Sequence, residues 1–447
     1  MASAPSAAPA PPRRALGKLV SASMVGTILE FYDFTIYGTI AALAFGQLFF
    51  PSDNPLAGVL ASFASLAAGF LARPLGSFLF GHFGDRLGRR NMLIISMLGI
   101  GLSTFLIGVL PTFETVGALA PVLLVALRLI QGISVGGEWG GAALMLVENS
   151  TQQRKGLLGS VSQMGGPSGL FLATLITWIS SAISGDAFLE WGWRIPFLFG
   201  GVIVLVGLWL RTSVGETPEF ERMREQRADT APKVPLVKVF RENWKAILLA
   251  FGIGVPGNAV FFTVATYTLS YGPSELELDR NMLLIVQTIV AVIQFITIPV
   301  FGWIADRTSP RAVLVFGASG ALVFALAYFP LIQTRNVFVI FLAMAVALGA
   351  IHAALQAPMA ALFSSRFDVS VRYTGVALSQ VFPPTLVGGT MPFVATLLFS
   401  ATGTTVLISV YTGVLAVIGI VCSAIRLKTD GSYDTPPAAA PAASQAS

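Results

Sequence analysis

Long apolar runs separated by short polar segments constrain this chain more than any other feature of its sequence. Each run is close to the ~20 residues that a helix needs to cross a hydrocarbon core about 30 Å thick. Lipid offers backbone groups no hydrogen-bond partners, so such runs fold as helices. The runs span approximately residues 19–45, 57–81, 92–111, 119–148, 157–183, 192–212, 245–271, 282–304, 312–332, 336–364, 372–400 and 404–427. The sequence therefore predicts an all-α integral membrane protein with twelve transmembrane helices.

Composition excludes a soluble globular fold. Of the 447 residues, 55% are hydrophobic and only 11% are charged, and the mean hydropathy is +0.78. That many charged residues could hardly cover a soluble particle of this size. The single cysteine, Cys422, leaves no possibility of an internal disulfide.

The charged and low-complexity segments divide the chain into five parts. Residues 1–18 and 428–447 are rich in Ala, Pro and Ser and are expected to be disordered tails. The longest polar connection, residues 213–244, separates the sixth run from the seventh and is expected to be a linker. Residues 19–212 and 245–427 are then two halves of six helices each.

Basic residues are distributed unequally over alternate connections, which predicts the orientation. With the N-terminus inside, the outer connections hold only Arg194, Arg280 and Arg335, whereas the remaining connections and tails carry many Lys and Arg. Both termini are therefore expected in the cytoplasm, with the chain in the cell membrane. The net charge of +5 follows from this topology, and nothing favours a nucleic-acid partner.

A polar turn is repeated at half-chain spacing. "GHFGDRLGRR" (81–90) follows the second run and "GWIADRTSPR" (302–311) follows the eighth, so that Gly302 comes 221 residues after Gly81 with Gly, Asp and Arg in register. The positive-inside rule alone explains the arginines but neither the glycines, the aspartates nor the repeat. The spacing predicts two related six-helix bundles, as in transporters built from repeats.

The first of these turns resembles the signature loop of the major facilitator superfamily, G-x-x-x-D-R-x-G-R-[RK]. "LEFYDFTIYG", "LRLIQGISVGGEWGGAALMLVE", "WGWRIPFLF" and "GETPEF" are further similar to the metabolite:proton symporter family within it, which includes shikimate, α-ketoglutarate, citrate and proline/betaine transporters. "VGGEWGGAAL" and "HAALQAP" resemble its shikimate transporter branch most. The resemblance implies the two-bundle major facilitator fold, a monomer, and proton-coupled symport of a small organic acid by alternating access.

The resemblance also implies that the first turn latches a cytoplasmic gate against the eleventh helix. In the second turn Ser309 and Pro310 stand where an intact copy would have Gly and Arg, so that turn is expected to be an eroded copy of the gate. The expected gate residues are Gly81, Asp85, Arg86, Gly88, Arg89, Arg90, Glu148, Asp306 and Arg307.

Ionisable residues at membrane depth cost at least ~2.5–3.5 kcal/mol each near the bilayer centre and mark a pathway by default. Five are found, all in the first half: Glu30, Asp33, Arg73, Arg128 and Glu138. Their depths predict that Arg73 pairs with Glu138 or Glu30, and Arg128 with Asp33. A fixed salt-bridge network that only holds three helices together is the alternative interpretation.

Three acids against two bases leave one carboxylate without a permanent cation, which is what a proton carrier requires. Asp33 is the first candidate and Glu138 the second, with Glu30 as a tuning partner one helical turn from Asp33. Arg128 presents a bidentate fork and could exchange Asp33 for a substrate carboxylate when that acid is protonated.

Neutral polar residues in the second half supply candidates for a central cavity. A hydroxylated acid would need partners of this kind, and His352 could either titrate or form an interhelical hydrogen bond. With Arg73 and Arg128, the expected substrate-binding residues are Asn258, Tyr267, Gln294, His352 and Gln356, and Gln287 and Gln380 are further candidates.

Small residues and prolines predict close packing and breaks. Gly132 and Gly136 belong to a series of glycines spaced four residues apart in the fourth helix. Such a series forms a smooth face against which another helix can pack closely. "MGGPSG" in the fifth helix and Pro383–Gly389 in the eleventh predict bends.

No enzymatic constellation is present: the sequence has no phosphate loop, no metal-spaced His/Cys cluster and no Ser/His/Asp set. We therefore expect neither an enzyme, nor a cofactor, nor a metal site. The alternatives to a symporter are a proton-coupled exporter, disfavoured by the incomplete glycine-proline pattern of the fifth helix, and a non-transporting sensor, disfavoured by the absence of a long soluble domain. Sodium as the coupling ion remains open.

Overall fold

A computed structural model describes residues 13–87, 89–136, 154–213, 236–367 and 372–427. This part of the chain is mainly helical and contains no strand. Nine helices within it are long and apolar enough to cross a membrane, and shorter apolar helices at Ile94–Val109, Leu119–Val135 and Arg194–Leu205 occupy the expected third, fourth and sixth runs. The predicted all-α membrane fold is confirmed.

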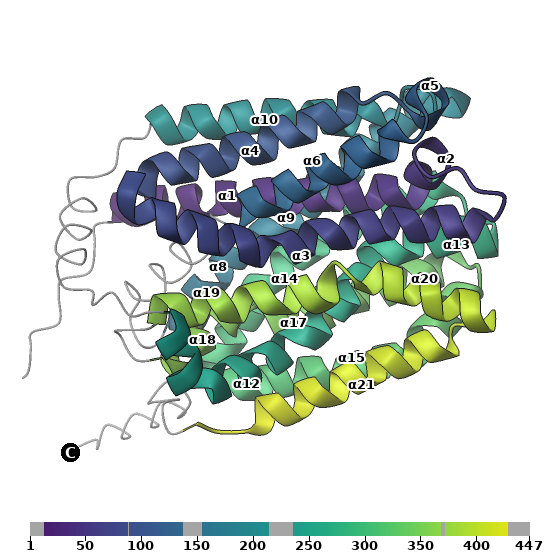
Figure 1. The fold of residues 1–447 in the computed structure, drawn as a ribbon. Coiled ribbons are helices and arrows are strands. Elements are labelled where there is room, and N and C mark those ends of the chain that lie inside the picture. The colour runs from purple at the N-terminus through teal and green to yellow at the C-terminus, as the bar shows by residue number, and fades with distance from the viewer. Residues whose placement is uncertain (1–12, 88, 137–153, 214–235, 368–371, 428–447) are drawn as a thin grey trace, which may run out of the picture.

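The two halves form two bundles that lie one above the other in Figure 1. The first contains α1 (Arg13–Ile40), η1 (Ala41–Phe45), α2 (Gly46–Leu48), α3 (Pro55–Leu87), α4 (Arg89–Val109), α5 (Phe113–Val116), α6 (Leu119–Val135), α8 (Lys155–Gln163), α9 (Gly165–Ser184), η3 (Gly185–Phe188) and α10 (Arg194–Ser213). The second contains α12 (Leu236–Phe262), η4 (Thr263–Tyr267), α13 (Thr268–Leu276), α14 (Arg280–Arg307), α15 (Pro310–Gln333), α16 (Val337–Val346), η5 (Ala347–His352), α17 (Ala353–Gln356), α18 (Met359–Arg366), α19 (Arg372–Pro383), η6 (Pro384–Gly388), α20 (Met391–Thr402) and α21 (Val406–Ala424).

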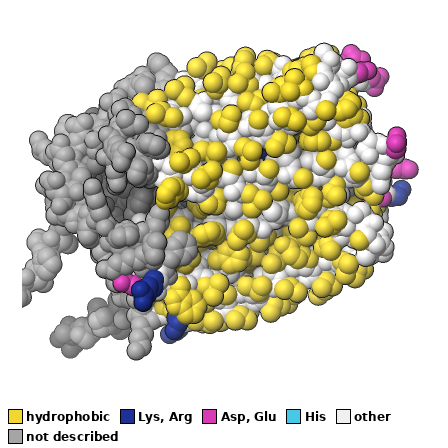
Figure 2. Space-filling view, in the orientation of Figure 1, with side chains coloured by type: hydrophobic (Ala, Val, Ile, Leu, Met, Phe, Trp, Pro, Cys, Tyr) yellow, Lys and Arg dark blue, Asp and Glu magenta, His cyan; other side chains and the backbone are white. Residues whose placement is uncertain are grey.

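The outer surface is suited to lipid. Figure 2 shows a face covered by hydrophobic side chains, with the visible charged side chains mainly near the two ends of the helices. Leu326 and Phe338 are 72% and 70% exposed, which in a soluble protein would leave a large unfavourable apolar surface. The exposed side chains therefore fit a bilayer as solvent.

Glycines bring α3 and α6 into backbone contact. A Cβ placed on Gly132 would lie 2.0 Å from the carbonyl oxygen of Gly69, and one on Gly136 would lie 2.3 Å from that of Arg73. The expected glycine face on the fourth helix is thus confirmed for these two residues. The close approach brings Arg73 on α3 near Arg128 on α6, which places the charged residues of the first bundle together.

Segments of π-helix interrupt several spans. The break expected at Pro383–Gly389 is present as η6, and α8 ends before Gly165 in the "MGGPSG" stretch. The π-segments η1 and η4 were not expected from sequence; their first residues, Ala41 and Thr263, are 222 residues apart, nearly the spacing of the polar turns. Gln287 on α14 donates to the carbonyl of Val264 inside η4 at 2.9 Å, so a carbonyl of the irregular segment finds a partner.

The bundles meet closely on the side where α1 ends, the predicted outer side. A Cβ on Gly38 would lie 2.9 Å from Oγ1 of Thr266, and one on Gly389 would lie 2.3 Å from the ring of Phe70. Arg280 donates to the carbonyl of Gly185 at 3.0 Å across the same side. These contacts join α1 to η4, α3 to the residue that follows η6, and α14 to η3.

Candidate functional site

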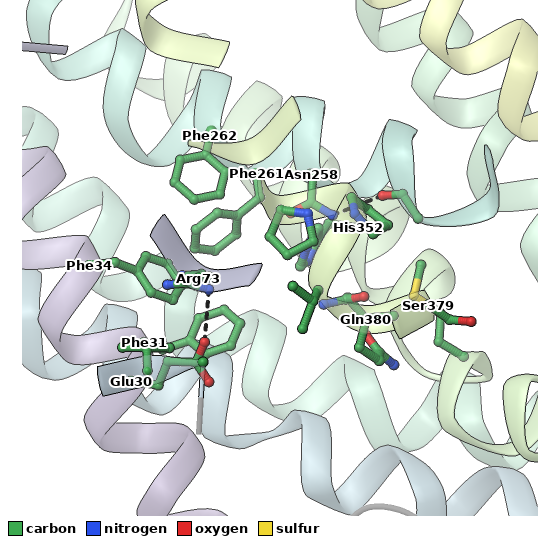
Figure 3. A pocket seen from close by; sticks show the side chains of 18 residues that line it. Glu30, Phe31, Phe34, Arg73, Asn258, Phe261, Phe262, His352, Ser379 and Gln380 are labelled. Carbon is green, nitrogen blue, oxygen red and sulfur yellow. Dashed lines mark hydrogen bonds and ion pairs between the residues drawn. The ribbon is translucent and has the colours of Figure 1, made fainter. Parts of the chain in front are cut away.

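A cavity lies between the bundles. Figure 3 shows the Glu30–Arg73 pair on one side and Asn258, His352, Ser379 and Gln380 on the other. The lining residues are Glu30, Phe31, Phe34, Arg73, Val135, Gly136, Gly254, Asn258, Phe261, Phe262, His352, Gln356, Met359, Ser379, Gln380, Val381, Pro383 and Pro384. Both halves of the chain therefore contribute to one polar and aromatic chamber.

The charged end of the cavity is an ion pair. Arg73 Nη1 on α3 donates to Glu30 Oε1 on α1 at 3.0 Å, and both residues are buried. The guanidinium of Arg73 also lies over the rings of Phe70 and Phe34, at 4.0 and 5.4 Å from their centroids. Of the two acids expected for Arg73, the structure pairs it with Glu30, while Glu138 lies outside the described residues.

A second buried ion pair lies beside the cavity, outside its lining. Asp33 Oδ2 on α1 is 3.5 Å from Arg128 Nη1 on α6, as expected. Gln131 and Thr104 both donate to Asp33 Oδ1, and Arg128 donates to Gln131 Oε1 at 2.5 Å. The Arg128 guanidinium also stacks 4.1 Å from the ring centroid of Tyr37. The pair is thus held in a network that spans α1, α4 and α6.

Thr104, Gln131 and Tyr37 are members of this network that sequence reasoning missed. Gln131 is three residues after Arg128 on the same helix, and this spacing was the available signal for a shared face. Thr104 has no such marker, because a threonine in an apolar run usually bonds a carbonyl of its own helix, as Thr104 also does to Ile100 at 2.7 Å.

The expected residues of the second half occupy different places. Asn258, His352 and Gln356 line the cavity. Gln294 is buried and lies 2.6 Å from His352 Nδ1, so the histidine has the interhelical partner that was one of its two expected roles. Tyr267 is not among the lining residues and stacks on Tyr271 at 5.8 Å between ring centroids.

The second polar turn joins the bundles. Asp306 Oδ1 and Oδ2 accept from the backbone N–H groups of Gly156 and Leu157, at 2.7 and 2.8 Å, at the start of α8. A carboxylate at a helix N-terminus is favoured by unpaired N–H groups and by the helix dipole. A Cβ on Gly302 would lie 2.4 Å from Oγ of Ser160, so the glycine of the repeat permits this approach.

Of the other residues expected to form the gate, only some lie in the part of the chain whose side chains the structure describes. Arg307 lies with its guanidinium 4.0 Å from the ring centroid of Trp303. Ser309 accepts from Arg311 N at 3.3 Å at the start of α15, whose first residue is Pro310, so the departure from the signature has a local role in starting a helix. The rest lie outside the residues whose side chains the structure describes: Gly81, Asp85, Arg86, Gly88, Arg89, Arg90 and Glu148.

Removing the Asp306 carboxylate is expected to loosen the bundles on the predicted cytoplasmic side. A helix-capping carboxylate contributes ~0.5–2 kcal/mol, so Asp306→Ala is expected to raise access to the cavity by about twofold to thirtyfold. The measurement is the labelling rate of Ser379→Cys, in a Cys422→Ser background, by an impermeant thiol reagent applied to inside-out vesicles. Asp279→Ala is the matched control, because Asp279 caps α14 within one bundle. Equal labelling rates in the Asp306→Ala variant, the Asp279→Ala variant and the parent protein would contradict a role for the Asp306 contact in holding the bundles together.

In the part of the chain that the structure describes, nine long apolar helices and three shorter ones form two bundles around a shared cavity, the arrangement of a multi-pass membrane protein of the transporter class. A family model described as Major Facilitator Superfamily matches residues 23–379 and, in a second match, 274–446. The chain belongs to this superfamily.

Individual relatives agree with this assignment. The chain is 38% identical over 390 residues to the shikimate transporter of Escherichia coli (strain K12), covering 87% of this chain and 88% of the relative. It is 37% identical over 394 residues to an inner membrane metabolite transport protein of the same strain, covering 86% and 88%. The resemblance drawn from the motifs is confirmed, and these matched relatives are transporters rather than enzymes.

A solved structure shares the fold. A crystal structure of a D-xylose-proton symporter superposes with a TM-score of 0.72 at 18% sequence identity, covering 94% of this chain and 98% of that one. At this identity the likeness concerns the fold alone. It agrees with two six-helix bundles in the arrangement of the major facilitator superfamily.

Proposed function

We propose that this protein is a secondary active transporter that takes up a small organic acid together with protons across the inner membrane. The observation that carries the proposal is an ion pair, Glu30–Arg73, in the wall of a cavity shared by both bundles, beside a second buried pair, Asp33–Arg128. Charged side chains at this depth are costly, so they are rare in membrane helices and mark a transport pathway by default. The names of the shikimate and metabolite transport relatives support the class of substrate.

In this proposal Asp33 carries the proton. When Asp33 is ionised it balances Arg128 and accepts from Thr104 and Gln131. Protonation removes that balance, and the network linking α1, α4 and α6 then has a second arrangement available. Two arrangements with different charge are what a proton gradient needs to bias alternating access. Glu138 remains the second candidate for this role.

The same proposal assigns the substrate carboxylate to Arg73. This guanidinium lines the cavity, and its planar fork suits a carboxylate. Asn258, His352 and Gln356 face the same space from the second bundle. A substrate that touches both bundles can favour the state in which they close around it, because a ligand shifts a conformational equilibrium only by binding one state better. Arg128 is the partner of the proton carrier.

The orientation belongs to the proposal as well. With both termini in the cytoplasm, the Asp306 contact with α8 lies on the cytoplasmic side, and the contacts of Gly38 and Gly389 lie on the outer side. Separation of one set of contacts at a time would open the cavity alternately to the two sides.

The test is uptake into proteoliposomes that contain the purified full chain. Labelled shikimate, α-ketoglutarate, citrate and glycine betaine are each offered with an inward proton gradient, with no gradient, and with an inward sodium gradient. The proposal predicts that one acid accumulates above its external concentration only with the proton gradient. Accumulation driven by sodium alone, or failure of every acid to accumulate with folded protein, would overturn it.

A further inference from the structure

The cavity has one charged end and one neutral polar end. Resting on the proposed function, we infer that the substrate is a hydroxylated monocarboxylate whose carboxylate takes the place of Glu30 on Arg73, while its hydroxyl groups bind the amide and hydroxyl side chains of the second bundle. The inference selects one class among the organic acids and zwitterions that such a transporter could carry. It also makes Glu30 on Arg73, rather than Asp33 on Arg128, the carboxylate that competes with the substrate.

Charge balance argues for a single carboxylate. Among the described lining residues, Arg73 is the only permanent cation and Glu30 the only acid. A substrate carboxylate on Arg73, with the symported proton on Asp33, leaves Arg73, Arg128, Glu30 and the substrate neutral as a group. A dicarboxylate would bring a second negative charge that no described lining cation balances, and an unpaired charge away from water is strongly unfavourable. The two-pronged guanidinium can pass from one carboxylate to the other without losing its hydrogen-bond geometry.

The opposite wall argues for hydroxyl groups. Asn258, Gln356 and Gln380 present amides, and Ser379 presents a hydroxyl. Asn258 uses its amide nitrogen to donate to Gly254 O at 2.9 Å, and Ser379 donates to Gly375 O at 2.7 Å, so both retain oxygen lone pairs as acceptors. A hydroxyl group can donate to such acceptors and accept from the other amides. A quaternary ammonium group has no hydrogen to donate, and no described acid stands in this wall to balance it.

Between the two ends the cavity is aromatic. Phe31 and Phe34 from α1 face Phe261 and Phe262 from α12, with centroid distances of 6.0 Å for Phe31–Phe261 and 5.8 Å for Phe34–Phe262. Figure 3 shows Phe261 next to Arg73 on the side toward Asn258, with Phe262 above it in the view. Such rings favour contact with carbon and C–H groups. The matching ligand is compact, with a carbon skeleton that separates one carboxylate from its hydroxyl groups.

The experiment is counterflow, which needs binding and exchange but no gradient. Proteoliposomes loaded with unlabelled shikimate, a hydroxylated monocarboxylate, are given labelled shikimate, with α-ketoglutarate and glycine betaine as competitors. Wild type is expected to exchange shikimate, and neither competitor should inhibit at concentrations about 100-fold higher. Arg73→Gln is expected to lose affinity by about 100-fold, since it removes the partner of a buried carboxylate. Glu30→Gln is expected to keep counterflow with a lower half-saturation concentration, because the competing carboxylate is gone.

Matched controls separate these effects from general damage. Arg194→Gln removes a partly buried arginine that donates to Gly108 O and Leu110 O, and Glu114→Gln removes an exposed acid; both should leave half-saturation unchanged. If Arg73→Gln does not fold, the double variant Glu30→Gln/Arg73→Gln leaves neither charge unpaired and is expected to fold without binding shikimate. Loss of counterflow in Glu30→Gln, or binding of shikimate by the double variant, would overturn the inference that the substrate carboxylate replaces Glu30 on Arg73.

The same liposomes distinguish failure of this inference from failure of the proposed function. If α-ketoglutarate or glycine betaine accumulates with a proton gradient and shikimate does not, the monocarboxylate assignment is wrong while symport stands. If no compound accumulates with any proton gradient, symport itself is wrong and this inference falls with it.

Discussion

Asp33→Asn is expected to abolish proton-driven accumulation of the substrate while leaving its exchange across the membrane intact. Asparagine retains an oxygen that can accept from Thr104 and Gln131, the two donors to the Asp33 carboxylate, but it never carries a proton for transport. The accumulation ratio should therefore fall to unity, the value reached without energy input. The measurement is paired: gradient-driven uptake and counterflow of the same compound in the same proteoliposomes.

Two further variants make this result specific. Asp53→Asn changes an exposed acid and should accumulate substrate like wild type. Asp33→Asn leaves Arg128 without its anion, and removing one partner of a buried pair costs about 3–5 kcal/mol, so Asp33→Asn/Arg128→Gln is included to restore neutrality. Undiminished accumulation in Asp33→Asn would show that the proton travels elsewhere.

Gly132→Val is expected to prevent the first bundle from assembling. Even a Cβ at this position would lie 2.0 Å from the backbone oxygen of Gly69, and a backbone atom cannot rotate away as a side chain can. α3 and α6 would have to separate, and Arg73 and Arg128 would move apart from Glu30 and Asp33. Overpacking of this kind typically costs about 1–3 kcal/mol, and more where backbone is displaced. We expect a lower unfolding midpoint and loss of most monodisperse protein in detergent.

Gly413→Ala is the matched control for this substitution. A Cβ at Gly413 would meet Leu322 and Ala325 at 3.8 and 3.9 Å, which is ordinary van der Waals contact. Its unfolding midpoint and size-exclusion profile should match those of wild type. A Gly132→Val protein with the same midpoint would mean that α3 and α6 do not pack as closely as described.

The sequence predicted the ion pairs because charged residues are rare at membrane depth and helical rise converts position into depth. That reasoning selected Asp33 for Arg128 and left Arg73 with two possible partners, of which the fold brings Glu30. It could not predict which pair would line the cavity. Both pairs join α1 to another helix of the first bundle, and their exposure to the cavity depends on how the second bundle is docked.

Neutral polar residues were less predictable. Thr104 carried no marker of function, and Gln131 was marked only by its spacing from Arg128, although one lies against Asp33 from α4 and the other from α6. Tyr267 illustrates the reverse case. Its polar group suggested a cavity residue, but most of a tyrosine is an apolar ring, and it stacks on Tyr271.

Breaks in the helices were predictable only where proline or glycine marked them. Pro383–Gly389 contains η6, whereas η1, η4 and η5 interrupt stretches that hydropathy cannot distinguish from continuous α-helix. A π-segment changes one hydrogen-bonded turn without changing the apolar character of the residues. The second polar turn shows a related limit: its departures at Ser309 and Pro310 indicated erosion, yet Asp306 still joins the bundles.

The central claim, that substrate and protons move together inward, is tested most directly by following protons during substrate uptake. Proteoliposomes in weakly buffered medium, with no imposed gradient, are given the transported acid while external pH is recorded. Symport predicts that the medium becomes more alkaline as labelled substrate enters, that a protonophore abolishes this change, and that Asp33→Asn lacks it. Substrate entry in wild type without any change of external pH would contradict the account.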